Sequence, residues 1–413
     1  MTETSIDNRP YITSSGRDLR LDFLRGYFIM IMIIDHIIGP SPLYWFTGGT
    51  RFFISGAEGF FLISGLVTGI VYHRIIESKG LKATLQKMIR RLFVLYLVAT
   101  SLKLVPLIFK DTLWTNNQAQ PLQITRVFTL QAGGVITAYV FLFILAPFAL
   151  TLLNRGKGYI LLAISWLWYI LYVFFPATVT FPFATFTNLS GLQVLFFTAM
   201  FVGFKEHKTL DYGKIIINKN WLFCFASCFL VLIILFILLN PPPMMQQDLI
   251  PQATKLWINA HLFDKATLRP GRLIAAIPVY GTFFVFLSLY WKKVVEAFGW
   301  IILPFGTSAL YAYSVHIPID YAINLLIASG VLSSTFISNM FIQTTAVLLI
   351  WFLTSWRVLA PTRETMKFWY LFPFVLGLLL LGIDFIHPQL LFTYFLRAIV
   401  YWITWFPASP VGL

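Results

Sequence analysis

Long apolar stretches separated by short polar connections run along the whole chain. The clearest is 221–239, which reads WLFCFASCFLVLIILFILL and carries no charged residue. About 20 apolar residues are enough for a helix to cross the hydrocarbon core of a membrane. The same pattern predicts helices at residues 22–40, 52–73, 91–109, 134–153, 158–175, 189–204, 221–239, 272–290, 303–327, 337–356, 369–386 and 389–406.

This pattern predicts an all-α, polytopic integral membrane protein of about 12 (10–12) transmembrane helices. Residues 1–19 are polar and are expected to form a cytoplasmic tail. Residues 20–327 are expected to form the membrane core, and residues 328–413 to add C-terminal transmembrane helices to the same domain. The final stretch, 389–406, contains Arg397, so whether it spans the membrane stays open.

Composition supports the membrane class and explains the charge. The 413 residues are 58% hydrophobic and 11% charged, with a net charge of +14, which is too apolar for a soluble protein of this length. If the N-terminus is cytoplasmic, most lysines and arginines lie on the cytoplasmic side, as the positive-inside rule requires. The charge therefore needs no nucleic-acid partner.

The only cysteines, Cys224 and Cys228, lie one turn apart in an apolar helix and are expected to be packing residues rather than metal ligands, and no metal signature occurs elsewhere.

The stretch Arg20–His36, RLDFLRGYFIMIMIIDH, places ionisable groups at both ends of one apolar helix. Eleven residues advance a helix by about three turns, so Arg25 and His36 share a face about 16 Å apart. Asp22 lies close to that face, whereas Asp35 lies about 100° round the helix. Ionisable groups at membrane depth indicate a functional site.

A second carboxylate is expected at the level of His36. The next helix returns inward, so Glu58 should fall in one layer with Asp35 and His36. A carboxylate beside an imidazole orients it and raises its basicity. We therefore interpret His36 as a candidate general base and Glu58 or Asp35 as its partner. A purely structural His–Glu pair is the alternative.

Two further polar groups have open interpretations. Lys87, Arg90 and Arg91 begin a helix at the cytoplasmic interface, level with Arg25. They are either membrane anchors or a phosphate-binding patch. His316 and Asp320 lie one turn apart on one helix face, and they either position a substrate or make a structural hydrogen bond.

Several motifs, in order along the chain, resemble those of the acyltransferase-3 superfamily of membrane acyltransferases. Its first helix carries an Arg, ten residues and a His, as Arg25 and His36 do here. The later matches are FFLISG at 60–65, RRLFVLY at 90–96 and SALYAYSVH at 308–316.

Within that superfamily the chain resembles the osmoregulated periplasmic glucan succinyltransferases of the OpgC type. Leu189 and Leu192 replace the Pro and Trp usual in one of the motifs, and the last third of the chain is only generically similar. The matching positions are Asp35-His36, Ala57-Glu58, Asn188, Gln193, Phe196, Lys265, Leu268, Pro270, Arg272 and Leu273.

The resemblance implies an O-acyltransferase of the bacterial inner membrane. A succinyl or acetyl group would move from cytoplasmic acyl-CoA, a co-substrate rather than a bound cofactor, to a hydroxyl of an extracytoplasmic glucan or other glycan. The implied catalytic residues are His36, Asp35 and Glu58. The donor would be bound by Arg25, Lys87, Arg90 and Arg91, and substrate by Asp22, Asn188, Gln193, Lys265, Arg272 and His316. An amino sugar or lipid-linked sugar as acceptor, and a membrane transporter, are the alternatives.

Overall fold

The computed structural model describes residues 10–13, 16–49, 52–109, 127–130, 134–176, 189–205, 219–240, 250–358 and 375. These residues form helices and one isolated β-bridge, between Ile12 and Asp18, with no strand among them. The all-α prediction is therefore confirmed for this part of the chain. Its elements are α1 (Leu19–His36), α2 (Tyr44–Thr47), α3 (Gly56–Phe109), α6 (Val135–Asn154), α7 (Gly158–Phe174), α8 (Leu189–Lys205), α10 (Lys219–Leu239), α11 (Gln252–Ile258), the π-helix η1 (Asn259–Phe263), α12 (Pro270–Leu289), α13 (Trp291–Thr307), α14 (Ala309–Ala328) and α15 (Phe336–Ser355).

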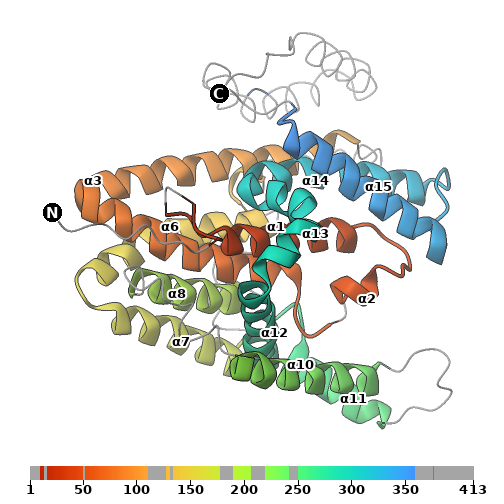
Figure 1. The fold of residues 1–413 in the computed structure, drawn as a ribbon, viewed down its shortest axis with the longest axis horizontal. Coiled ribbons are helices and arrows are strands. Elements are labelled where there is room, and N and C mark those ends of the chain that lie inside the picture. The colour runs from red at the N-terminus through yellow and green to blue at the C-terminus, as the bar shows by residue number, and fades with distance from the viewer. Residues whose placement is uncertain are drawn as a thin grey trace.

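Helix α3 consists of two limbs that join at Gly80. This residue has φ of +76°, which glycine adopts without steric cost. Residues from both limbs, Ser64–Tyr72 and Lys87–Leu102, line one cavity, so the second limb folds back along the first (Figure 1). The helices predicted at 52–73 and 91–109 correspond to these limbs.

The number of helices that can cross a membrane differs from the prediction. In the described part of the chain five helices are long and apolar enough, or six if α13 and α14 count as one broken span. The estimate of about twelve spans is therefore not what the structure supports. Five features account for the difference: the two limbs of α3 are counted once, α1 carries several charged residues, α7 and α8 have only 17 residues each, the helix predicted at 303–327 is broken, and 369–386 and 389–406 lie outside the described residues.

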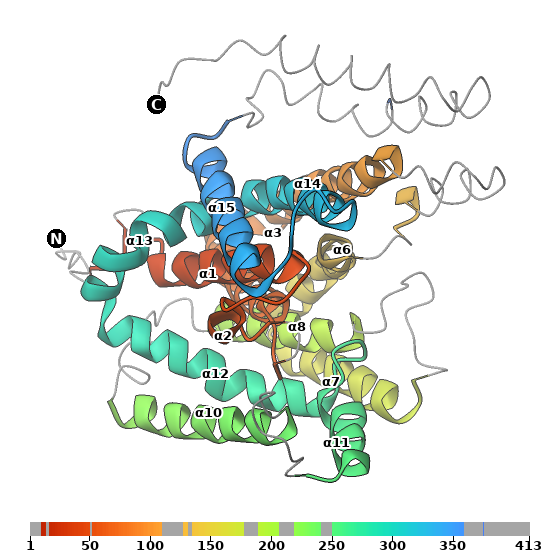
Figure 2. The same ribbon diagram turned by 90° about the vertical axis from the view of Figure 1, so that its right-hand side faces the viewer.

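The exposed surface fits a membrane environment. Helix α10 lies alongside α12 at the edge of the molecule (Figure 2). Several of its apolar side chains, such as Phe223 and Val231, are exposed, and Leu239 is the one residue of this helix that is buried. Trp166 on α7 and Phe341 on α15 are exposed as well. Such contiguous apolar surface is unfavourable in water and is matched by lipid chains.

Helix α1 lies in the middle of the molecule and packs against α3, α13, α14 and α15 (Figures 1 and 2). Its closest neighbour is α13. A Cβ on Gly306 would lie 1.7 Å from the backbone oxygen of Asp22, and one on Gly26 would lie 2.1 Å from that of Ile302. Glycine at both positions allows the two backbones to touch.

The helix predicted at 303–327 is broken in the structure. Helices α13 and α14 meet at Ser308 and are bent by 91°. Pro304 weakens the helix just before the break because it removes a backbone donor, and Gly306 holds α13 against α1 at this point. The bend directs α14 along a different path, towards the C-terminal end of α1.

We expect Gly306→Ala to lower the thermal unfolding midpoint of the purified protein in detergent. The added methyl group would meet the rigid backbone of α1, and overpacking of this kind costs about 1–3 kcal/mol. Gly299→Ala on the same helix is the matched control, because its methyl group would meet only the movable Val295 side chain. Equal midpoints for the two variants would contradict the close packing of α1 and α13.

Candidate functional site

A cavity of about 1100 Å³ lies between α1, the two limbs of α3, α6 and the α13–α14 break. Phe60 and Tyr72 both line it and are twelve residues apart on one helix, so it extends about 18 Å along α3. Its walls are mainly apolar. Phe60, Ile136, Tyr139 and Tyr313 are among the residues that line it.

Five cations also line this cavity, and we call them the cationic cluster: Arg17, Arg25, Lys87, Arg91 and Arg357. The charges of Arg17 and Arg91 act on Arg25. Arg90, which the sequence grouped with Lys87 and Arg91, is exposed and does not line the cavity. The predicted patch therefore keeps three members, Arg25, Lys87 and Arg91, and gains Arg17 and Arg357.

Asp22 holds two members of the cationic cluster in place. Arg17 donates to both of its oxygens, at 2.5 and 2.8 Å, and Arg25 Nη1 lies 3.4 Å from Oδ1. The hydrogen bond that Arg17 donates to Asp22 raises the pKa of the Arg17 guanidinium above its usual value. One buried carboxylate thus orders two arginines and leaves the cluster with an excess of positive charge, which suits an anionic ligand.

His36 ends α1, and 41% of its side chain is exposed. It does not line the cavity. Its Nδ1 lies 3.7 Å from Asp320 Oδ2, and its ring stacks on His316 with the centroids 5.5 Å apart. The partner of His36 is therefore a carboxylate on α14, and not Glu58 or Asp35 as the sequence suggested.

His316 and Asp320 are buried beside His36. Asp320 Oδ2 lies 4.0 Å from His316 Nε2, and among the described residues none of the side-chain nitrogen and oxygen atoms of these two residues has a hydrogen-bond partner. The ring of His316 also contacts Tyr313, centroid to centroid 4.8 Å, and Tyr313 lines the cavity. Two side chains in series, Tyr313 and then His316, thus connect the cavity wall to His36.

Two imidazoles and a carboxylate are also a common set of metal ligands. One ligand atom from each of His36, His316 and Asp320 lies within 4.8 Å of the others. The sequence could not indicate this group, because about 280 residues separate His36 from the other two and no ligand-spacing motif results.

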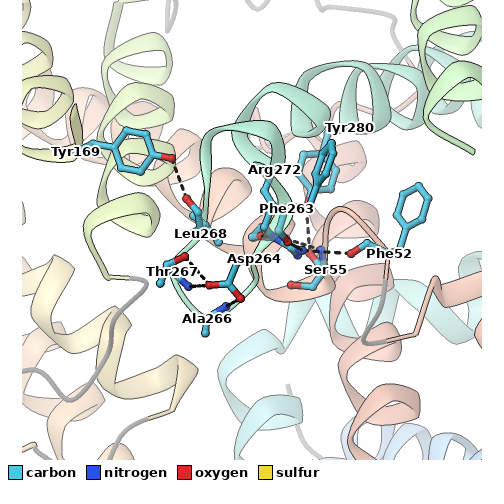
Figure 3. A network of polar contacts seen from close by, with 11 residues as sticks. Phe52, Ser55, Tyr169, Phe263, Asp264, Ala266, Thr267, Leu268, Arg272 and Tyr280 are labelled. Atoms are coloured by element: carbon cyan, nitrogen blue, oxygen red, sulfur yellow. Dashed lines mark hydrogen bonds and ion pairs between the residues drawn. The ribbon is translucent and has the colours of Figure 1, made fainter. Parts of the chain in front are cut away.

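Glu58 belongs to a different network. Its two carboxylate oxygens accept from Arg272 Nε at 2.6 Å and Nη2 at 3.0 Å, and Ser55 N also donates to it. Arg272 Nη1 donates to the carbonyl oxygens of Phe52 and Phe263, at 3.2 and 3.3 Å (Figure 3). Both partners are buried. A paired carboxylate is not available to His36, and four of the five N–H donors of Arg272 are already engaged.

The remaining predicted residues lie in three other places. Asp35 accepts from Thr47 Oγ1 at 2.7 Å. Gln193 is buried between α7 and α8, where Ser165 and Ser190 satisfy its amide, so it has a structural environment away from the cavity. Lys265 is exposed in the turn before α12. Asn188 lies outside the described residues.

Several hydrogen bonds hold the turn that carries Lys265. Asp264 accepts from Thr267 N at 2.9 Å and Thr267 Oγ1 at 2.5 Å, and Tyr169 donates to the carbonyl oxygen of Leu268 (Figure 3). Partial burial raises the pKa of Asp264, but these hydrogen bonds outweigh it and bring the pKa below its usual value. The turn therefore presents Lys265 from a fixed backbone.

The fold and site define a class: a helical membrane protein with an internal apolar cavity, a cationic cluster on its wall and a His–His–Asp group in which His316 and Asp320 are buried and His36 is exposed. A family model described as OpgC protein matches residues 17–361 of the chain. The chain therefore belongs to the OpgC family. Searches of curated proteins and of solved structures gave no match.

We expect Arg272→Ala to destabilise the fold strongly. Removing one partner of a buried ion pair leaves an uncompensated charge, and such changes cost about 3–5 kcal/mol. The measurement is thermal unfolding in detergent, with the exposed Lys265→Ala from the same segment as the control. A stable Arg272→Ala protein would show that the Glu58–Arg272 pair does not support the fold.

Proposed function

We propose that this protein is a membrane-bound O-acyltransferase that transfers an acyl group from acyl-CoA to a hydroxyl of an extracytoplasmic glucan or related glycan. Membership in the OpgC family supports an acyltransferase that modifies glucans. The observation that carries the proposal is the cavity itself, because it joins a cationic cluster to an apolar interior whose wall, at Tyr313, connects to His36 through His316.

The two parts of the cavity match the two parts of an acyl-CoA. Phosphate groups bind best to arginine and lysine, and the cationic cluster supplies five such side chains. The less polar arm with the thioester then extends between α3 and α6, where Phe60 and Tyr139 line the wall. By the positive-inside rule the basic ends of α1 and α3 face the cytoplasm, which is the compartment that holds acyl-CoA.

The reaction takes place where the cavity approaches His36. The thioester must pass Tyr313 and the edge of His316 to reach the imidazole, and the exposed side of His36 admits the acceptor. The acceptor oxygen attacks the thioester carbon while His36 takes the hydroxyl proton. The carbon–sulfur bond then breaks, and the departing thiolate receives that proton. No residue of the enzyme is consumed, and the products are the acyl ester and free CoA.

The same arrangement bears on which acyl group is transferred. A succinyl group adds a second carboxylate to the donor, whereas an acetyl group does not. Arg272 is buried, and Glu58 and two carbonyl groups take four of its five N–H donors. Lys265 is exposed and is the cation of the predicted pair with room for such a carboxylate. Succinyl-CoA and acetyl-CoA are accordingly the two donors to compare.

The first test of the reaction is release of free thiol from succinyl-CoA and acetyl-CoA by the purified protein in nanodiscs, with and without a periplasmic glucan preparation. We expect release to depend on the glucan, and His36→Ala to reduce it about 100-fold or more, the usual contribution of general base catalysis. Full activity of His36→Ala would rule out His36 as the base. Absence of acyl-CoA binding by folded protein would rule out the acyltransferase.

A second test uses two neighbouring arginines. We expect Arg91→Ala to raise the KM for acyl-CoA about tenfold or more, since a hydrogen bond to a charged group contributes about 1.5–3 kcal/mol. Arg90→Ala removes the same charge from the same turn of α3 but lies outside the cavity, and should leave KM unchanged. Equal effects of the two substitutions would indicate general surface attraction and not a binding cavity.

A further inference from the structure

Three polar residues of α14 form one stripe that faces the C-terminal end of α1. His316, Asp320 and Asn324 are four residues apart in succession, so they lie on one face of the helix. Asp320 approaches His36 Nδ1 at 3.7 Å, and His316 stacks on the His36 ring. Helix α14 thus supplies the side chains that lie beside the His36 ring.

Asn324 fixes the backbone of this junction. Its amide nitrogen donates to the carbonyl oxygen of His36 at 2.8 Å, and its amide oxygen accepts from Ile38 N at 2.9 Å. These two bonds satisfy backbone groups left over where α1 ends. They also fix the position of His36 relative to Asp320, because Asn324 and Asp320 belong to the same rigid helix.

The Asp320 carboxylate has no other partner that would explain its position. It is 3% exposed, and neither oxygen accepts a hydrogen bond from another residue of the structure. The two groups nearest to it are ring nitrogens, His36 Nδ1 and His316 Nε2, and both face the same oxygen, Oδ2. Burying a carboxylate without a hydrogen bond is costly, so a function that uses it is the better explanation.

We propose that Asp320 is the positioning residue of His36, held in place by His316. This inference rests on the proposed acyl transfer and deepens it. Asp320 accepts from the proton-bearing Nδ1 of His36, which leaves the lone pair of Nε2 directed at the acceptor hydroxyl. The 3.7 Å separation is longer than a hydrogen bond, and catalytic hydrogen bonds often tighten only when substrate is bound.

The arrangement also compensates the charge that forms during the reaction. When His36 Nε2 takes the proton from the hydroxyl, the ring becomes a cation, and the side of the ring that faces Asp320 and His316 is buried. The Asp320 carboxylate beside Nδ1 neutralises it. The same proton then leaves Nε2 for the thiolate, and His36 and Asp320 return to their starting states. His316, which is fully buried, takes no part in bond making and keeps the carboxylate oriented.

The test is a double-mutant cycle on acyl transfer. We expect Asp320→Asn to lower kcat about 100-fold or more with little change in the KM for acyl-CoA, because the donor cavity is intact. Asp320→Glu should restore part of the activity. In a His36→Ala background, Asp320→Asn should have no further effect, since Asp320 acts only through His36. A further loss in that background, or full activity of Asp320→Asn alone, would overturn the proposal.

Controls separate this role from folding and from metal binding. Ser329→Ala, at the exposed end of α14, should behave as the wild type. We expect Asp320→Asn to bind acyl-CoA as tightly as the wild type and to have the same thermal unfolding midpoint. A loss of both would show that Asp320 is a structural residue and would overturn the proposal. The last control is metal analysis of the purified protein. A stoichiometric metal ion that is present in the wild type and absent from His316→Ala would show that these residues form a metal site, and would overturn the proposal.

These results remain distinguishable from failure of the proposed function. If His36→Ala is inactive but Asp320→Asn is fully active, the acyltransferase stands and the positioning role fails. If wild-type protein neither binds nor cleaves acyl-CoA, the proposed function fails first.

Discussion

The low polarity of the membrane interior is the constraint on which this structure depends. Every charged group on the central helix α1 needs a partner, because an unpaired charge in an apolar environment is unfavourable. Arg20 illustrates the rule at one end. It is fully buried and is held by Asp18, by Ser288 and by the ring of Tyr11, 3.8 Å from its guanidinium carbon. Asp22 is held in the same way by Arg17 and Arg25.

This constraint explains why distant parts of the chain meet at α1. Each partner must be brought in by another helix, and close packing allows it. The contact of Gly26 and Gly306 brings α13 onto α1, and the bend at Ser308 then directs α14 along the far end of that helix. As a consequence, Asp320 and Asn324 reach His36, 284 and 288 residues away in the sequence. The broken helix is thus part of the site.

The sequence predicted what depends on local pattern. Runs of apolar residues located α1, α6, α7, α8, α10, α12 and α15 to within four residues, and the helical repeat placed Arg25 and His36 on one face. The count of membrane spans was overestimated, because apolar composition alone does not show that α7 and α8 have only 17 residues each or that 303–327 is broken at Ser308. Residues 291–302 were missed as a helix, since α13 has charged residues at its start and is amphipathic, not uniformly apolar.

The choice of long-range partners was beyond sequence reasoning. Glu58 and Asp35 were sound candidates for His36 by depth, but depth does not fix which face of a helix a carboxylate occupies. Glu58 is taken by Arg272, 214 residues away, which offers a planar guanidinium with two parallel donors. His36 is left with Asp320. The motif containing His316 did mark α14 as polar, and that signal located the right helix without identifying the pairing.

The separation of charges within the site has a functional consequence. The cationic cluster lies near the start of α1, and the His36 group lies at its other end, about 16 Å from Arg25. A donor whose anionic groups are held by the cluster can therefore extend its neutral arm towards His36 without bringing its phosphates there. Phosphate charge close to the imidazole would favour the protonated ring, which cannot act as a base. If His36 is the base, as proposed, the distance set by eleven residues of α1 keeps the binding charge and the reacting group apart.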